Sequence, residues 1–307
     1  MPEDINVKNK HKIKKEKKKY HFDFDELKMY FSEPYMIKME NGVYIEISQP
    51  SIGEILELGD REVYSSISPF ITNTTSYRVQ LWDLGQDWNK ITDYELFTSL
   101  VPYANNVEFL FKKLEIIENP YYDENSDDTE RYIKIYDDID FSKLKAYGRK
   151  IDSEDSEEDL MEVVLCDPEQ GIIITEEIYM HIREYIRMMF NQHPKEEFAK
   201  GKLAKKWIIE EEKENIRLEN EKNGGRKKSI LLPMVSSLLN HPGFKYDLDG
   251  IKKLGIFAFM DSVRRLQMYE QCIAFMGGMY SGMMDTSKIG PEELNKRLNW
   301  LQDIYEE

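Results

Sequence analysis

The sequence contains few of the residues on which disulfide frameworks and metal sites depend. Of its 307 residues, only two are cysteines and five are histidines. Cys166 and Cys272 each lie in an apolar stretch, where a cysteine usually acts as a small buried hydrophobic residue. No two histidines have the spacing of roughly three to five residues that is typical of zinc ligands. We therefore expect no disulfide framework, no metal site and no cofactor.

Long apolar segments and phosphate-binding loops are also missing. No apolar run reaches the roughly 18 residues that span a membrane, and the N-terminal region has no apolar signal-peptide core. Gly201-Lys202 lacks the earlier glycine and the following Ser or Thr of a P-loop. His181, on an expected helix, has no Ser or Cys nucleophile nearby and is read as a half-buried structural residue. These absences predict a non-enzymatic protein of the cytoplasm with no membrane contact and no catalytic residues.

Charge is abundant and unevenly distributed. The chain has 42 basic and 58 acidic residues, for a formal net charge of -16. Residues 1–19 hold eight lysines and three acids, so the rest of the chain is more acidic than the total suggests. An acidic body argues against nucleic-acid binding, except through this Lys-rich tail. A solvated, disordered tail is the alternative interpretation of the same residues.

Hydrophobic patterning predicts a mainly α protein with a small β portion, of the α+β class. We expect four parts: a basic disordered tail (1–19), a hairpin plus helical unit (20–111), a small acidic β insertion (112–175) and a helical C-terminal domain (176–307). The last part is a helical bundle with a long charged helix over 195–222.

Local signals support these assignments. Asn41-Gly42 joins two alternating apolar runs over 35–47, which predicts an N-terminal hairpin with a type I′ turn. Ser51 with Glu54, and Thr92 with Glu95, have the spacing of helix capping boxes. In the expected insertion, Asp123 to Asp127 imitates the first five positions of a calcium loop, but Asp128 replaces the glycine and Lys134 the final glutamate, so we reject a calcium site.

The segment from Ile256 to Met284 is apolar on several faces and holds six of the 15 methionines. Flexible thioethers form adaptable grooves for partner helices, although an ordinary domain core explains the same stripe. The candidate partner-binding residues are Phe257, Phe259, Met260, Met268, Phe275, Met276, Met279, Met283, Trp82 and Trp88.

Three stretches carry a resemblance to a known family: residues 49–59 (QPSIGEILELG), residues 81–97 (LWDLGQDWNKITDYELF) and the segment from Lys228 through His241-Pro242-Gly243 to Val263. They resemble proteins encoded among the tail genes of tailed phages that infect Gram-positive bacteria. The pattern is similar to the tail assembly chaperones of such phages, which bind the tape measure protein and help tail tube subunits polymerise around it.

This resemblance implies a non-enzymatic chaperone of phage tail morphogenesis in the host cytoplasm. Its implied partners are the tape measure protein and the tail tube protein, and a homo-oligomer stays open. One alternative is a structural tail or baseplate component of the virion. A second is a metal-dependent hydrolase that uses Asp83, Asp87 and Asp93, although these residues are better explained as caps and local hydrogen-bond acceptors.

Overall fold

The computed structural model describes residues 20, 22–120, 122, 131–151, 160–224 and 228–302. It confirms the mixed α+β class. The strands are β1 (Tyr35–Lys38), β2 (Tyr44–Ile47), β3 (Phe111–Glu118), β4 (Tyr132–Asp138), β5 (Lys145–Ile151), β6 (Leu160–Asp167) and β7 (Ile172–Ile174). The helices are α1 (Glu26–Tyr30), α2 (Ile52–Leu58), α3 (Asp60–Ile71), α4 (Arg78–Asp83), α5 (Asp93–Leu100), α6 (Glu176–Phe190), α7 (Lys202–Asn223), α8 (Leu232–Asn240), α9 (Leu248–Lys253), α10 (Ile256–Tyr280) and α11 (Pro291–Leu298).

The predicted hairpin forms, but its turn is of a different type. β1 and β2 pair antiparallel, with Lys38 opposite Tyr44. Met39 and Val43 close a three-residue loop in which Gly42 alone has a positive φ, of 84°. A type I′ turn needs a positive φ at both central residues, whereas a type I turn followed by a left-handed glycine needs only one. The type I′ prediction was therefore wrong.

The strands of the expected β insertion are divided between two sheets. β3 pairs with β2 on one side and with β4 on the other, which gives an antiparallel sheet of order β1-β2-β3-β4. β5, β6 and β7 form a second antiparallel sheet. The boundary between 111 and 112 therefore falls inside β3, and 112–175 is not a separate insertion. β5 was not expected, because its three basic residues and Gly148 hide the alternating pattern of a strand.

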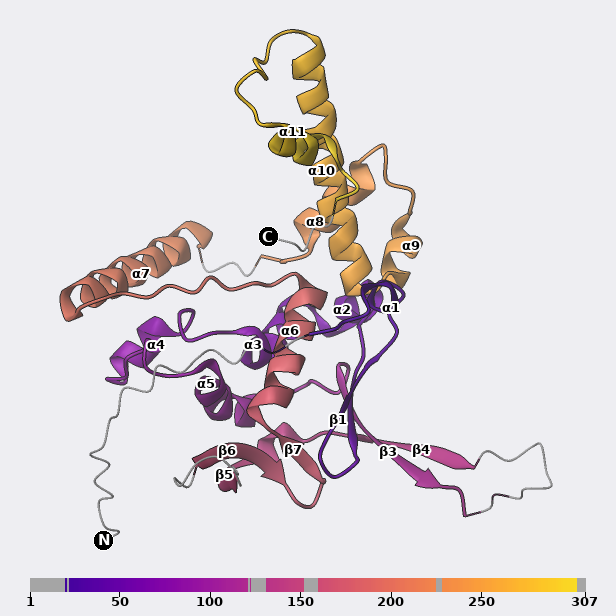
Figure 1. Cartoon of the computed structure of the whole chain (residues 1–307), viewed down its shortest axis with the longest axis vertical. Helices are drawn as coiled ribbons and strands as arrows, with labels where there is room; N and C mark the ends of the chain where they lie inside the picture. The colour runs from indigo at the N-terminus through magenta and orange to yellow at the C-terminus, as the bar shows by residue number, and fades with distance from the viewer. Residues whose placement is uncertain are drawn as a thin grey trace.

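The helical unit forms as its caps predict. Ser51 and Glu54 make both hydrogen bonds of a capping box at α2, and Thr92 and Glu95 do so at α5. α2 and α3 meet at Gly59. α6 passes through the centre of the molecule and buries its apolar face against α3, β7 and the first part of α10 (Figure 1).

The charged helix is shorter than predicted, since α7 begins at Lys202 and not at 195. The preceding segment is held by side chains of the helical unit: Asn73 donates to the carbonyl oxygen of Lys195 (3.0 Å) and Asn89 to that of Ala199 (2.7 Å). Residues 192–200 have no regular secondary structure. α7 also packs against α4 through a small apolar cluster that includes Ile209.

The C-terminal region is helical, as expected, and α10 is its longest element. The short helices α1, α9 and α11 were not anticipated. Among the helices in the described ranges, none combines the length and apolar character needed to cross a lipid bilayer. The predicted disordered tail (1–19), the calcium-like sequence after 122 and the acidic run 152–159 lie outside the described residues.

Candidate partner-binding surface

The base of α10 is fixed to the body of the protein. The amide of Ile256 donates to the carbonyl oxygen of Pro50 (3.0 Å), just before α2. Gly255, the residue before the helix, approaches another segment so closely that an added Cβ would lie 2.1 Å from Oγ of Ser32. Residues 256–261 are all buried. The orientation of α10 at its base is therefore set by this backbone hydrogen bond and by the close approach of Gly255 to the Ser32 side chain.

Asp261 marks the point where α10 leaves the core. Its carboxylate is buried, and Oδ1 lies 3.4 Å from Nε of Arg265. Burial raises the pKa of Asp261 above its ordinary value, and the charge of Arg265 opposes part of that shift. Arg265 also donates to the carbonyl oxygens of Trp300 (3.2 Å) and Gln302 (2.7 Å). Arg265 thus connects the part of α10 that leaves the core to the chain segment that follows α11.

Beyond Asp261, residues 262–302 form what we call the distal arm. In this arm α10 extends away from the body and α11 folds back beside it (Figure 1). Sγ of Cys272 donates to the carbonyl oxygen of Leu298 (3.1 Å), and the guanidinium of Arg297 lies 5.6 Å from the ring centroid of Phe275. One face of α10 is thereby covered by α11, and the opposite side faces outward.

Two hollows border α10. One, of about 370 Å³, lies between α10 and α11 and is lined in part by Met268 and Phe275. The other, of about 460 Å³, lies between α8 and α10 and includes Leu266 in its lining. Beside it, Nε2 of His241 is 2.9 Å from Oε1 of Glu270, which connects the end of α8 to α10. Each hollow is large enough to take an apolar side chain of a partner protein.

The tip of the distal arm exposes large apolar side chains. Tyr280 is 87% exposed and Met283 is 90% exposed. Met284 is 39% exposed beside them, whereas the exposed Trp300 and Leu301 lie near the base of the arm, where Arg265 binds the carbonyl oxygen of Trp300. Scattered apolar residues are common on surfaces, but several large ones on one projecting element mark an interaction site. This part of the arm is the best candidate surface for a partner in the described chain.

The predicted partner-binding residues do not form one surface. Phe257, Phe259 and Met260 lie in the main core at the base of α10, so their assignment to a binding surface was wrong. The helix carries them inward because its first turns pack against α6. The other residues of the predicted α10 stripe lie on the distal arm: Met268, Phe275, Met276, Met279 and Met283.

The two predicted tryptophans belong to a different region. Trp82 and Trp88 contact each other edge to face, with ring centroids 6.2 Å apart, in the cluster between α4 and α7. Trp88 is buried, and its Nε1 donates to the carbonyl oxygen of Glu197 (3.2 Å). Trp88 is therefore a packing residue and is not available to a partner.

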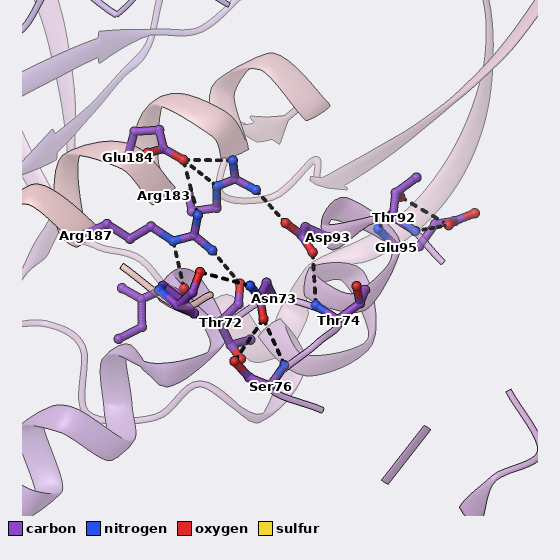
Figure 2. Close-up of polar contacts among 12 residues, drawn as sticks. Thr72, Asn73, Thr74, Ser76, Thr92, Asp93, Glu95, Arg183, Glu184 and Arg187 are labelled. Carbon is purple, nitrogen blue, oxygen red and sulfur yellow. Dashed lines mark hydrogen bonds and ion pairs between the residues drawn. The ribbon is translucent and has the colours of Figure 1, made fainter. Parts of the chain in front are cut away.

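The three aspartates of the hydrolase alternative are bound to three different cations. Asp83 accepts from Lys213 (2.6 Å) and Asp87 from Lys205 (2.6 Å). Asp93 accepts from Arg183 and from the amide of Thr74, as Figure 2 shows. Within the described ranges, no group of three His, Cys, Asp or Glu side chains is placed to hold a metal ion. The geometry therefore gives no support to a shared metal site at these aspartates.

The exposed residues of the C-terminal segment, Trp300 and Leu301, were not singled out from the sequence, because no individual helix was placed beyond 284 within the helical C-terminal domain. A signal was present: Gly290-Pro291 followed by Glu292 and Glu293 is a typical helix start, and Leu294 and Leu298 share one face of that helix.

Comparison of the chain with protein families, with curated proteins and with solved structures finds no match.

Proposed function

We propose that this chain is a non-enzymatic binding protein of phage tail morphogenesis that acts in the host cytoplasm. In this proposal it serves as an assembly chaperone for a tape measure protein, and it promotes polymerisation of tail tube subunits around that partner. The observation that carries the binding role is the exposed apolar tip of the distal arm, centred on Tyr280 and Met283. The tail-assembly assignment depends on the resemblance of residues 49–59, 81–97 and 228–263.

The shape of the arm suits a long helical partner. α10 is anchored at its base and stabilised along one side by α11, and it exposes Tyr269, Ile273 and Tyr280 at helical spacing, which form an apolar ridge. An amphipathic helix can bury its apolar face against such a ridge and insert side chains into the neighbouring hollows. The arm would order one stretch of a tape measure protein without enclosing it, which suits a chaperone that must later release its client.

The test is affinity capture of the full chain from phage-infected host cells, followed by mass spectrometry. The parent chain should enrich a long helical tail protein, and the double variant Tyr280→Asp, Met283→Asp should lose it. Both residues are exposed, so the variant should fold normally. Leu56→Asp, at an exposed apolar position on α2, is the matched control and should capture the partner as the parent does.

Two results would count against this function. Equal capture by the parent and by the Tyr280, Met283 double variant would show that the distal arm does not bind the partner. Recovery of the chain at a fixed copy number in purified particles would instead favour the structural tail or baseplate alternative, because an assembly chaperone is released before the virion is complete.

A further inference from the structure

The β3–β4 hairpin extends away from the body beyond the core of the first sheet (Figure 1). Leu114 is its last fully buried residue. Beyond Leu114, large apolar side chains are exposed on both faces of the two strands: Ile116, Ile117, Tyr132, Ile135 and Tyr136. A two-stranded ribbon with no covering layer is only marginally stable in water, and a third or fourth strand stabilises it.

β4 is also the last strand of its sheet, so one of its edges has no strand beside it in the described part of the chain. Strand edges that must stay free are usually interrupted by proline, by a bulge or by several like charges. β4 has no proline, and its sequence YIKIYDD combines β-branched and aromatic residues with charges of both signs. Such an edge is suited to pair with another strand.

The hydrogen-bonding direction of β4 follows from one backbone contact. The amide of Asn119 donates to the carbonyl oxygen of Arg131 (2.8 Å), which makes this a hydrogen-bonded pair of the β3–β4 ladder. Because such pairs recur at every second residue, Ile133 and Ile135 also direct their backbone groups toward β3. The even-numbered residues between Tyr132 and Asp138 therefore direct their amide and carbonyl groups toward the open edge.

Charge then selects a register for pairing between two copies. In an antiparallel arrangement symmetric about Tyr136, Lys134 of each copy lies opposite Asp138 of the other. Registers symmetric about Lys134 or about Asp138 place like charges face to face, which is unfavourable. In the register symmetric about Ile135, Lys134 faces Tyr136 of the other copy, so it has no acidic partner.

The exposed edge of the second sheet gives a useful contrast. β5 is an edge strand of similar length, and its charged residues are Lys145, Arg149 and Lys150. Two copies of β5 would bring cations together without any acid on the strand to balance them. β4 therefore has the charge pattern for self-pairing, and β5 does not.

We propose that two copies of this chain associate through β4. The two strands pair antiparallel with Tyr136 at the twofold axis, so that the first sheets of both copies join into one continuous sheet. Tyr136 of each copy then faces its counterpart across the junction, and two Lys134–Asp138 pairs form per dimer. This pairing involves a different surface from the distal arm and does not depend on the proposed function.

The first test measures the mass of the full chain by sedimentation equilibrium over a concentration series. The parent should show a reversible monomer–dimer equilibrium. Lys134→Glu places like charges at both pairs and should weaken dimerisation by about tenfold or more. Asp138→Lys alone should do the same, and the double variant should recover dimerisation. A monomeric parent at all attainable concentrations, or a dimer unaffected by Lys134→Glu, would overturn the proposal.

The second test determines the register of the β4–β4 pairing by oxidative cross-linking. Tyr136→Cys should form a disulfide-linked dimer, because a residue on the twofold axis faces its own copy at a distance a disulfide can span. Tyr132→Cys is the matched control: it has the same edge, face and similar exposure, but no counterpart of itself across the junction. Cross-linking confined to Tyr136→Cys supports the register, whereas equal cross-linking of both variants would refute it.

Discussion

Nη1 of Arg183 lies 2.8 Å from Oδ2 of Asp93, which joins the central helix α6 to the first turn of α5. Arg183 and the neighbouring Arg187 are both buried, and Glu184 contacts the two guanidinium groups (Figure 2). Burial, together with the charge of Arg183, lowers the pKa of Arg187 below its ordinary value. Two buried cations are thus balanced by two acids, and Asp93 is one of them.

Loss of Asp93 should therefore destabilise the fold. Asp93→Ala leaves Arg183 without its partner on α5, and breaking a buried ion pair costs about 3–5 kcal/mol of the free energy of unfolding. Asp83→Ala removes the exposed pair with Lys213 and should cost less than about 1 kcal/mol. Urea denaturation of both variants measures the difference. Equal losses would mean that the Arg183–Asp93 pair contributes no more than a surface contact.

Alkaline pH should destabilise the protein through its buried tyrosines. Burial raises the pKa of Tyr179 from 10.0 to about 12, with Arg183 opposing part of the shift. The unfolded chain releases this proton at lower pH than the folded chain, so stability is complete below pH 10 and is lost as pH rises toward 12. For Tyr179 the loss over that window is about 3 kcal/mol.

Tyr179→Phe should make this alkaline loss of stability less steep, because the variant has no phenol to ionise at that position. Tyr103→Phe is the matched control, since Tyr103 is 78% exposed. Denaturant midpoints measured from neutral pH to about pH 12 test the prediction. The same slope in the parent and in Tyr179→Phe would contradict it.

Gly255→Ala should loosen the base of the distal arm. The new Cβ would overlap Oγ of Ser32, and overpacking of this kind costs about 1–3 kcal/mol. Ser32 itself has a positive φ of 59°, which suits glycine better than serine. Ser32→Gly should therefore stabilise the parent slightly and largely rescue Gly255→Ala. A double-mutant cycle by thermal denaturation tests this, and strictly additive effects would disprove the contact.

Replacement of a large side chain by alanine should change the stability of the protein very differently at the two ends of α10. Phe259→Ala removes a fully buried ring from the main core and should cost about 3–5 kcal/mol. Tyr280→Ala removes an exposed aromatic ring from the same helix and should change stability by no more than about 0.5 kcal/mol. Chemical denaturation compares them. A large loss for Tyr280→Ala would show that the tip is packed and not free for a partner.

Several parts of the fold could be predicted from neighbouring residues alone. The capping boxes at Ser51 and Thr92 require only residues three positions apart, and the structure has both. The hairpin over 35–47 was likewise recognisable from alternation and from Asn41-Gly42. The turn type was not, because Asn41 also accepts from the amide of Val43 and donates to the carbonyl oxygen of Gly171, a residue far along the chain.

The candidate binding surface was only partly predictable, because an apolar stripe does not show what covers it. The sequence by itself determined the α+β class, the helix starts and the apolar character of α10, since these follow from local spacing and composition. Only the tertiary structure decided that Phe259 is core, that Tyr280 is exposed and that β4 is left at an edge. Those outcomes depend on which distant segments pack together, and the physical reason is that burial and strand pairing are properties of neighbours in space.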